Sequence, residues 1–189
     1  MLNLAKLGIM HTMDDEAEKI QKEIDELNGM IESYEDTDPL YLHKYLKDLR
    51  NKAMYVHARI ETSLEILISD SVLDSLQLDD LQLDTFASVM FYTEMNKIYE
   101  PLKYSKKVNL ALKRNKINET AKSLFYKVND LRLYFSHPKD FEEKIDELKL
   151  DTKYKDALTT LLDALRELNR IFSDRNRTYG RKSVKRTIM

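Results

Sequence analysis

The stretch YLKDLRNKAMYVHARIETSLEIL, residues 45–67, decides the fold of this chain. Its apolar residues recur every three or four positions, which places them on one face of a helix. The members of this stripe are Tyr45, Leu49, Ala53, Val56, Ile60, Leu64 and Leu67. A long helix with one apolar face is stable in water only when other elements cover that face, so the stretch predicts a helical bundle.

The rest of the chain has the same helical spacing. We predict helices over about residues 14–34, 40–73, 84–99, 105–114 and 151–172, another from about 118 until His137-Pro138 interrupts it, and a polar helix over 139–148. Residues 74–83 alternate like a strand, but a single strand would have no partner, so we interpret them as a loop or a short helical turn. With three glycines and three prolines in 189 residues, helix breakers are scarce. The predicted fold class is therefore all-α, an antiparallel bundle of four to five helices with an extra acidic N-terminal helix.

The composition excludes several classes of site. The chain has no cysteine, which excludes disulfides, thiolate zinc sites and thiol catalysis. Three glycines are too few for a Gly-rich phosphate loop. The four histidines lack the spacing of a helical metal site, and there is no Glu-x-x-His motif, so we expect neither a metal nor a cofactor. No apolar run is long enough to span a membrane, and no signal peptide is evident, so we expect a cytoplasmic protein.

The net charge of −2 is the sum of strongly charged blocks. Residues 14–38 carry −9, residues 103–127 carry +7, and residues 175–189 carry +6. Such blocks are typical either of anionic-ligand sites with a masking arm or of solvated helix faces with a disordered tail. We divide the chain into an acidic helix or appendage (1–38), a helical bundle domain (39–174) and a basic, disordered tail (175–189).

The acidic first helix has a heptad seam formed by Ala17, Ile20, Ile24, Leu27 and Ile31. This seam indicates either packing within the chain or one side of a dimer. Residues 14–34 are also the segment through which we expect a protein partner to bind, if the chain has one.

One segment carries residues suited to chemistry. The sequence VNDLRLYFSHP, residues 128–138, places Arg132 and His137 at the end of an apolar helix. It resembles the R-x4-H signature of the HEPN superfamily. About 70 residues earlier, the helix around His57 and Glu61 fits the order of elements in that family. The stretch Ser105–Leu112 is similar to the segment before the motif in mannitol-operon-repressor-like members.

The resemblance implies a HEPN-like bundle that cleaves RNA without a metal, as a toxin or host-defence protein. In such enzymes the RNA's own 2′-OH attacks the adjacent phosphate. His137 would then be the general acid/base, because histidine titrates near neutral pH. Arg132 would bind the phosphate and stabilise the transition state. Supporting polar groups would come from Glu61 and His57, and RNA would be guided by Lys106, Lys107, Lys113 and Arg114.

Residues five apart on a helix point about 140° away from each other, so Arg132 and His137 would not converge on one phosphate. Either Pro138 lets His137 turn, or two copies of the chain form a composite site. The family resemblance favours the homodimer. Leu133 departs from the family pattern, since many active members carry a polar residue there.

Two other functions stay open. The chain is alternatively a non-catalytic interaction or regulatory module, or a protein that binds RNA or DNA without cleaving it. In these cases Arg132 would be a surface charge paired with Asp130 or Glu142, and His137 would cap the end of its helix.

Overall fold

The computed structural model describes residues 4–34, 39–76, 85–136 and 150–187, and the regular structure within them is entirely α-helical. The helices are α1 (Leu4–Glu32), α2 (Pro39–Ser75), α3 (Thr85–Tyr99), α4 (Tyr104–Lys113), α5 (Glu119–Phe135) and α7 (Leu150–Thr187). The predicted all-α class is therefore confirmed for the described residues. The predicted polar helix over 139–148 and most of the predicted loop over 74–83 lie outside them.

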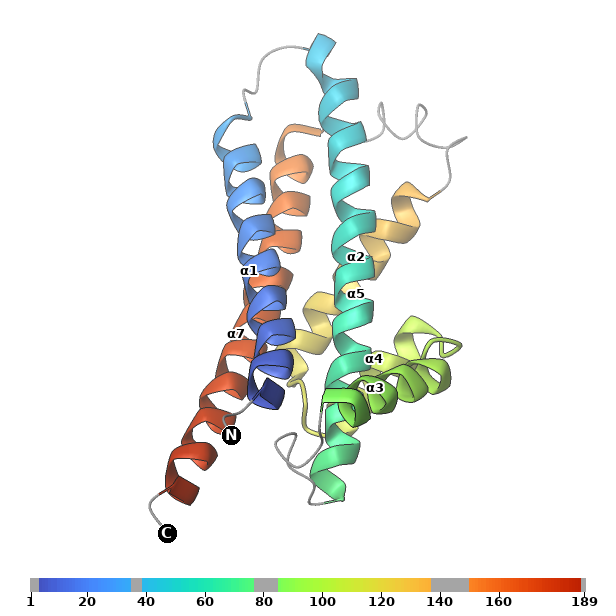
Figure 1. Cartoon of the computed structure of the whole chain (residues 1–189). Helices are drawn as coiled ribbons and strands as arrows, with labels where there is room; N and C mark the ends of the chain where they lie inside the picture. Colours follow the sequence, from blue (N-terminus) through green and yellow to red (C-terminus); the bar gives the residue numbers. More distant parts are fainter. Residues whose placement is uncertain (1–3, 35–38, 77–84, 137–149, 188–189) are drawn as a thin grey trace.

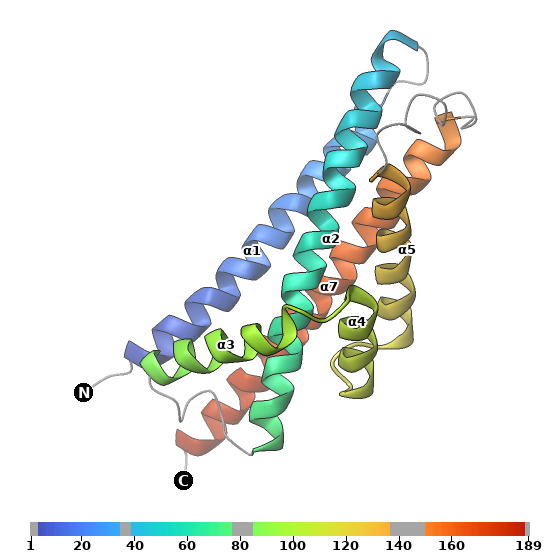
Figure 2. The same cartoon turned by 90° about the vertical axis from the view of Figure 1, so that its right-hand side faces the viewer.

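Four helices form an antiparallel bundle, in which α1 and α5 run opposite to α2 and α7 (Figure 1). Helix α7 is central, because it packs against α1, α2 and α5. The short α4 packs against both α2 and α5, and α3 crosses α2 near its C-terminal half and reaches α1 (Figure 2). Helix α2 is thus in contact with α3, α4, α5 and α7.

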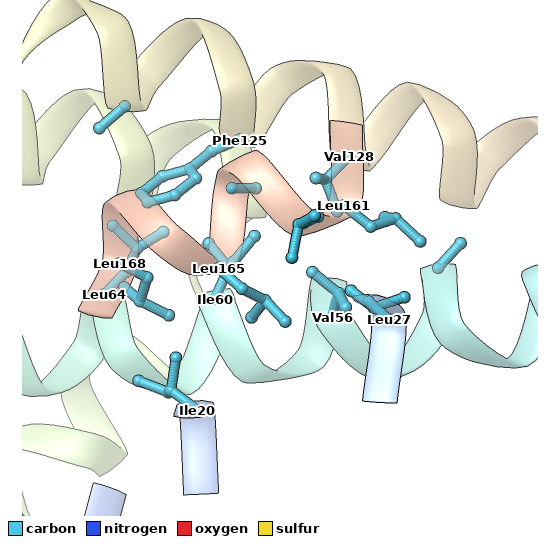
Figure 3. Close-up of a cluster of buried hydrophobic side chains, with 14 of the residues drawn as sticks. Ile20, Leu27, Val56, Ile60, Leu64, Phe125, Val128, Leu161, Leu165 and Leu168 are labelled. Atoms are coloured by element: carbon cyan, nitrogen blue, oxygen red, sulfur yellow. The ribbon is translucent and has the colours of Figure 1, made fainter. Parts of the chain in front are cut away.

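The core lies where the apolar stripes of the four bundle helices meet (Figure 3). From Leu49 to Leu67, every predicted member of the α2 stripe is buried. On α7, Leu158, Leu161, Leu162, Leu165, Leu168 and Phe172 are buried in the same core. Burying each large aliphatic side chain contributes roughly 1.5–3 kcal/mol, so these stripes supply most of the driving force for the fold.

Helix α1 is part of this core, so the expectation of an appendage needs correction. The helix begins at Leu4, before the predicted start, and its seam residues Ile20, Ile24 and Leu27 are buried within the chain. Polar contacts flank the seam: Arg166 of α7 donates to Asn28 at 3.3 Å, and Asn169 of α7 donates to Gln21 at 3.2 Å. Of the two interpretations of the seam, the structure shows packing within the chain.

The basic C-terminal segment also differs from its prediction. Helix α7 continues to Thr187, whereas the charge of residues 175–189 had indicated a disordered tail. Lysine and arginine are good helix formers, and a single interior glycine, Gly180 here, costs only about 1 kcal/mol. Net charge alone was therefore a poor guide to the backbone conformation of this segment.

Two helix ends match their sequence signals. Pro39 is the first residue of α2, where proline's missing N–H has no cost. Asn118 caps α5, because its side-chain oxygen accepts the backbone N–H of Ala121 at 2.8 Å. Among the described helices, none combines the length and the apolarity that crossing a membrane requires.

Candidate functional site

The candidate site lies where α2, α4 and α5 pack together, and Arg132 is its permanent cation. Arg132 is half-buried in the last turn of α5, and its positive charge acts on the imidazole of His57 on α2. Since α5 packs along α2, the bundle brings these two residues together from segments far apart in the sequence. Two of the residues singled out from the sequence therefore share one site.

His57 is held between aromatic and amide groups. Its side chain is buried, with 7% of the residue exposed. The imidazole stacks on the ring of Tyr104 from α4, with ring centroids 4.3 Å apart and an interplanar angle of 25°. It is hydrogen-bonded to the side chain of Asn129 on α5. Its Nε2 atom is buried and has no hydrogen-bond partner within the described part of the chain.

The surroundings of His57 favour its neutral form. Burial lowers the pKa of His57 below its usual value of 6.5, and the positive charges of Arg132 and Lys107 lower the pKa further. The Glu61 carboxylate and the hydrogen bond to Asn129 oppose this shift without cancelling it. A neutral imidazole therefore stands beside a permanent guanidinium, and it does not repel that cation.

Lys107 is a buried partner of two glutamates. Only 1% of the residue is exposed. Its Nζ lies 2.7 Å from Glu61 Oε1 and 2.5 Å from Glu65 Oε1, so α4 is tied to two successive turns of α2. Because this ammonium is buried and paired with two carboxylates, Lys107 does not offer its charge to RNA as the sequence had predicted. The role of Lys107 is structural. Glu61 both pairs with Lys107 and raises the pKa of His57.

Tyr104 fixes the other side of His57. Its hydroxyl donates to the backbone carbonyl of Phe125 on α5 at 3.0 Å. Burial raises the pKa of Tyr104 far above its usual value, and the negative charge of Glu61 raises it further. The phenol therefore stays protonated and keeps α4 attached to α5.

The other predicted cations lie on the surface. Lys106, Lys113 and Arg114 are exposed. Lys113 and Arg114 line a pocket of about 550 Å³ that also contains Ser71 of α2. His57 and Ser71 are fourteen residues apart on α2, which corresponds to about 21 Å along the helix. The structure therefore places Lys113 and Arg114 away from Arg132.

His137 lies just outside the described residues, which end at Ser136 in this segment. The helix ends there, with the Ser136 hydroxyl donating to the Leu133 carbonyl at 2.8 Å. Leu133 itself is 47% exposed, so it presents an apolar side chain to solvent near the motif. Within the described residues Arg132 forms no ion pair, and in particular none with Asp130; Glu142 lies outside them.

Sequence reasoning missed Asn129, Tyr104 and the burial of Lys107. Asn129 precedes Arg132 by three positions, a spacing that places both on one face of α5. On α4 the buried residues are Tyr104, Lys107, Val108 and Ala111, which follow the helical period. The helical period therefore places Lys107 on the buried face of α4, although its charge suggested a position on the surface.

We expect the stability of the protein to depend on His57 in mildly acidic solution. A histidine whose folded pKa lies below its unfolded value contributes stability above pH 6.5, and this contribution is lost as the pH falls through the folded pKa. Chemical unfolding should therefore show that stability decreases between about pH 8 and pH 5. The decrease should be smaller in His57→Phe, which keeps an aromatic ring but cannot titrate. Equal slopes in both proteins would contradict the assigned burial of a neutral imidazole.

No group of three or more His, Cys, Asp or Glu side chains in the described residues is arranged to hold a metal ion. The site that the structure does show consists of Arg132 and His57 with Glu61, Asn129 and Tyr104 around them. Comparisons with protein-family models, with curated proteins and with solved structures found no match to this chain.

Proposed function

We propose that the protein is a HEPN-like, metal-independent endoribonuclease of the toxin or host-defence type, acting as a homodimer. One observation carries the proposal: the charge of Arg132, in the R-x4-H motif, acts on His57 of α2, on which the Glu61 carboxylate also acts. The motif and the earlier helix were both singled out from the sequence through the resemblance to the HEPN superfamily. Their meeting in one place supports a functional role for Arg132 over an isolated surface charge.

In the proposed reaction, Arg132 binds the scissile phosphate and stabilises the charge that develops when the 2′-OH attacks. A guanidinium suits this task because its planar N–H groups match phosphate oxygens. His137 moves the protons, taking one from the 2′-OH or giving one to the leaving 5′-oxygen. His57 does not touch the RNA, because its side chain is buried. In the proposal it is a positioning residue that lies within the electrostatic influence of Arg132.

The proposed homodimer solves the geometry of the motif. If the motif continued as a helix, positions five apart would point about 140° away from each other, and two copies of the chain would supply the converging Arg132 and His137 instead. In a two-fold dimer, the motifs of both copies line one cleft. Lys106, Lys113 and Arg114 are exposed cations on α4 and its C-terminal end, and in the proposal they attract the RNA strand.

The proposal is tested with purified protein, single-stranded RNA and EDTA. We expect cleavage that leaves 2′,3′-cyclic phosphate ends, and we expect His137→Ala to abolish it. His43→Ala, which changes a histidine outside the motif, is the matched control and should cleave normally. Undiminished cleavage by His137→Ala would overturn the assignment of the general acid/base. Salt-dependent RNA binding without any cleavage would select the non-catalytic RNA-binding alternative.

A further inference from the structure

We infer that the pocket between the C-terminal ends of α2 and α4 binds a phosphate group of the RNA strand, at a distance from the cleavage site. This inference rests on the proposed function, because it takes RNA as the ligand. The pocket has a volume of about 550 Å³ and is lined by Ser71, Asp74, Ser75, Leu110, Lys113, Arg114 and Lys116. That volume is large enough to admit a phosphate group.

Three cations and one carboxylate give this pocket a net positive charge. Lys116 already pairs with Asp74, at 2.5 Å between Nζ and Oδ2. Lys113 is exposed and forms no ion pair with any described residue. Arg114 is also exposed and forms none within the described part of the chain. Two positive charges are therefore available to an anion at this place.

Arg114 is aimed by a buried serine. One of its guanidinium nitrogens donates to Ser71 Oγ at 3.2 Å. Ser71 is itself fixed, because its hydroxyl donates to the Ile68 carbonyl at 2.6 Å within α2. The remaining guanidinium N–H groups make no hydrogen bond to the described residues, and such a fork is suited to bidentate contact with phosphate oxygens. Ser71 is therefore a positioning residue for Arg114.

The turn after α4 is also rigid. Lys116 N–H donates to the Ala111 carbonyl, and Asn115 N–H donates to the Leu112 carbonyl, both at 2.9 Å. Asn115 adopts a φ of 55°, the left-handed conformation that closes this type of helix end. The two hydrogen bonds fix the backbone between Lys113 and Lys116, so the side chains of these cations start from neighbouring positions. Such preorganisation lowers the entropic cost of binding.

A phosphate is the anion that fits these features best. A guanidinium fork flanked by ammonium groups matches a tetrahedral group with several acceptor oxygens. The phosphate comes either from the internal backbone of a strand or from a phosphate monoester, such as a strand end or a free nucleotide. Both sources share the same contacts with Lys113 and Arg114, and the experiment separates them.

The test measures binding of a 2′-O-methyl RNA of about 12 nucleotides, a length typical of single-strand sites. This probe lacks the attacking hydroxyl, so binding is measured without cleavage. We expect the double variant Lys113→Gln/Arg114→Gln to bind about tenfold more weakly, with a smaller dependence of affinity on salt. The matched control is Lys97→Gln/Lys122→Gln, which removes two cations that pair with Glu94 and Glu119, and it should bind like the unchanged protein.

A second variant is designed to strengthen binding of the probe at the pocket. Asp74→Asn removes the carboxylate that occupies Lys116, so we expect tighter binding of the same probe, by a few-fold. Adding a nucleoside monophosphate identifies the source of the phosphate: competition at the pocket selects a monoester, and its absence selects the backbone. Either result supports the site, provided that the double variant is impaired.

The inference is overturned if the double variant and its control bind the probe equally well. Lys113 and Arg114 would then serve only the C-terminal end of α4, where cations stabilise a helix. Failure of the proposed function gives a different result. If the protein binds the probe through this pocket but never cleaves unmodified RNA, the phosphate site is supported and the ribonuclease proposal is rejected. If the protein cleaves RNA normally and the double variant binds the probe as well as its control, only the phosphate site in the pocket is rejected.

Discussion

Arg132→Ala is expected to slow RNA cleavage by about 10²–10³-fold, the usual effect of removing one group that stabilises transition-state charge. The loss should fall mainly on kcat, because the phosphate gains charge only as the 2′-OH attacks. Single-turnover cleavage of an RNA with one preferred site measures this step directly. The matched control is Lys127→Ala, which removes an exposed cation of the same helix and should leave the rate unchanged.

Arg132→Lys separates charge from shape. Lysine keeps the positive charge but cannot donate two parallel hydrogen bonds, so we expect a rate between those of the unchanged protein and Arg132→Ala. A rate equal to that of the unchanged protein would show that charge alone is sufficient.

The same variant also has a readout that does not depend on activity. The charge of Arg132 lowers the pKa of His57, so Arg132→Ala should raise that pKa, and NMR of the imidazole resonances measures it. A pKa that does not move would show that Arg132 does not lie beside His57 in solution. If Arg132→Ala raises the pKa of His57 but cleaves RNA at the full rate, Arg132 lies near His57 and does not take part in catalysis.

The architecture was predictable because helical period and helix breakers are local signals. The stripe from Leu49 to Leu67 and the helix start near Asn118 depend only on neighbouring residues, and both are present in the structure. The sequence identified the seam of Ile20, Ile24 and Leu27 but did not show what covers it, and the structure buries these residues against the rest of the bundle instead of leaving α1 as an appendage. Burial of a seam depends on partners that lie far away in the sequence.

The candidate site was predictable only in part, because its residues come from three helices. A spacing rule identifies Arg132 and His137 on one segment, but it contains nothing about which residue of α2 faces them. His57 was named as a supporting residue, and its contact with Tyr104 follows from how α4 packs on α2. Lys107 was the clearest error, since a charge block suggested a surface and the bundle placed the ammonium against two carboxylates.

Lys107→Met is expected to destabilise the fold by about 3 kcal/mol, at the lower end of the cost of breaking a buried ion pair. Methionine fills a similar volume, so the loss comes from leaving Glu61 and Glu65 side by side without a counter-charge. We place the effect at the lower end because the side chain of Glu61 is 32% exposed and water screens part of its charge. Urea unfolding at neutral pH measures the difference.

A compensating variant shows whether the unpaired charges are the cause. Lys107→Met combined with Glu61→Gln and Glu65→Gln has no buried charge in the cluster, so it should recover much of the lost stability. If the triple variant is no more stable than Lys107→Met, the loss comes from packing around the lysine stem instead. If Lys107→Met is as stable as the unchanged protein, the two ion pairs make no net contribution.

Alkaline pH gives an independent measure of the same ion pairs. Burial lowers the pKa of Lys107, but the hydrogen bonds and charges of Glu61 and Glu65 outweigh burial, so the pKa lies above its usual value of 10.5. A raised folded pKa contributes stability that is complete below 10.5 and is lost as the pH rises through the folded value. The unchanged protein should therefore lose stability above about pH 10.5 more steeply than Lys107→Met. Because Lys107 and Tyr104 lie on the same short helix, the loss of this anchor should also release the ring that stacks on His57.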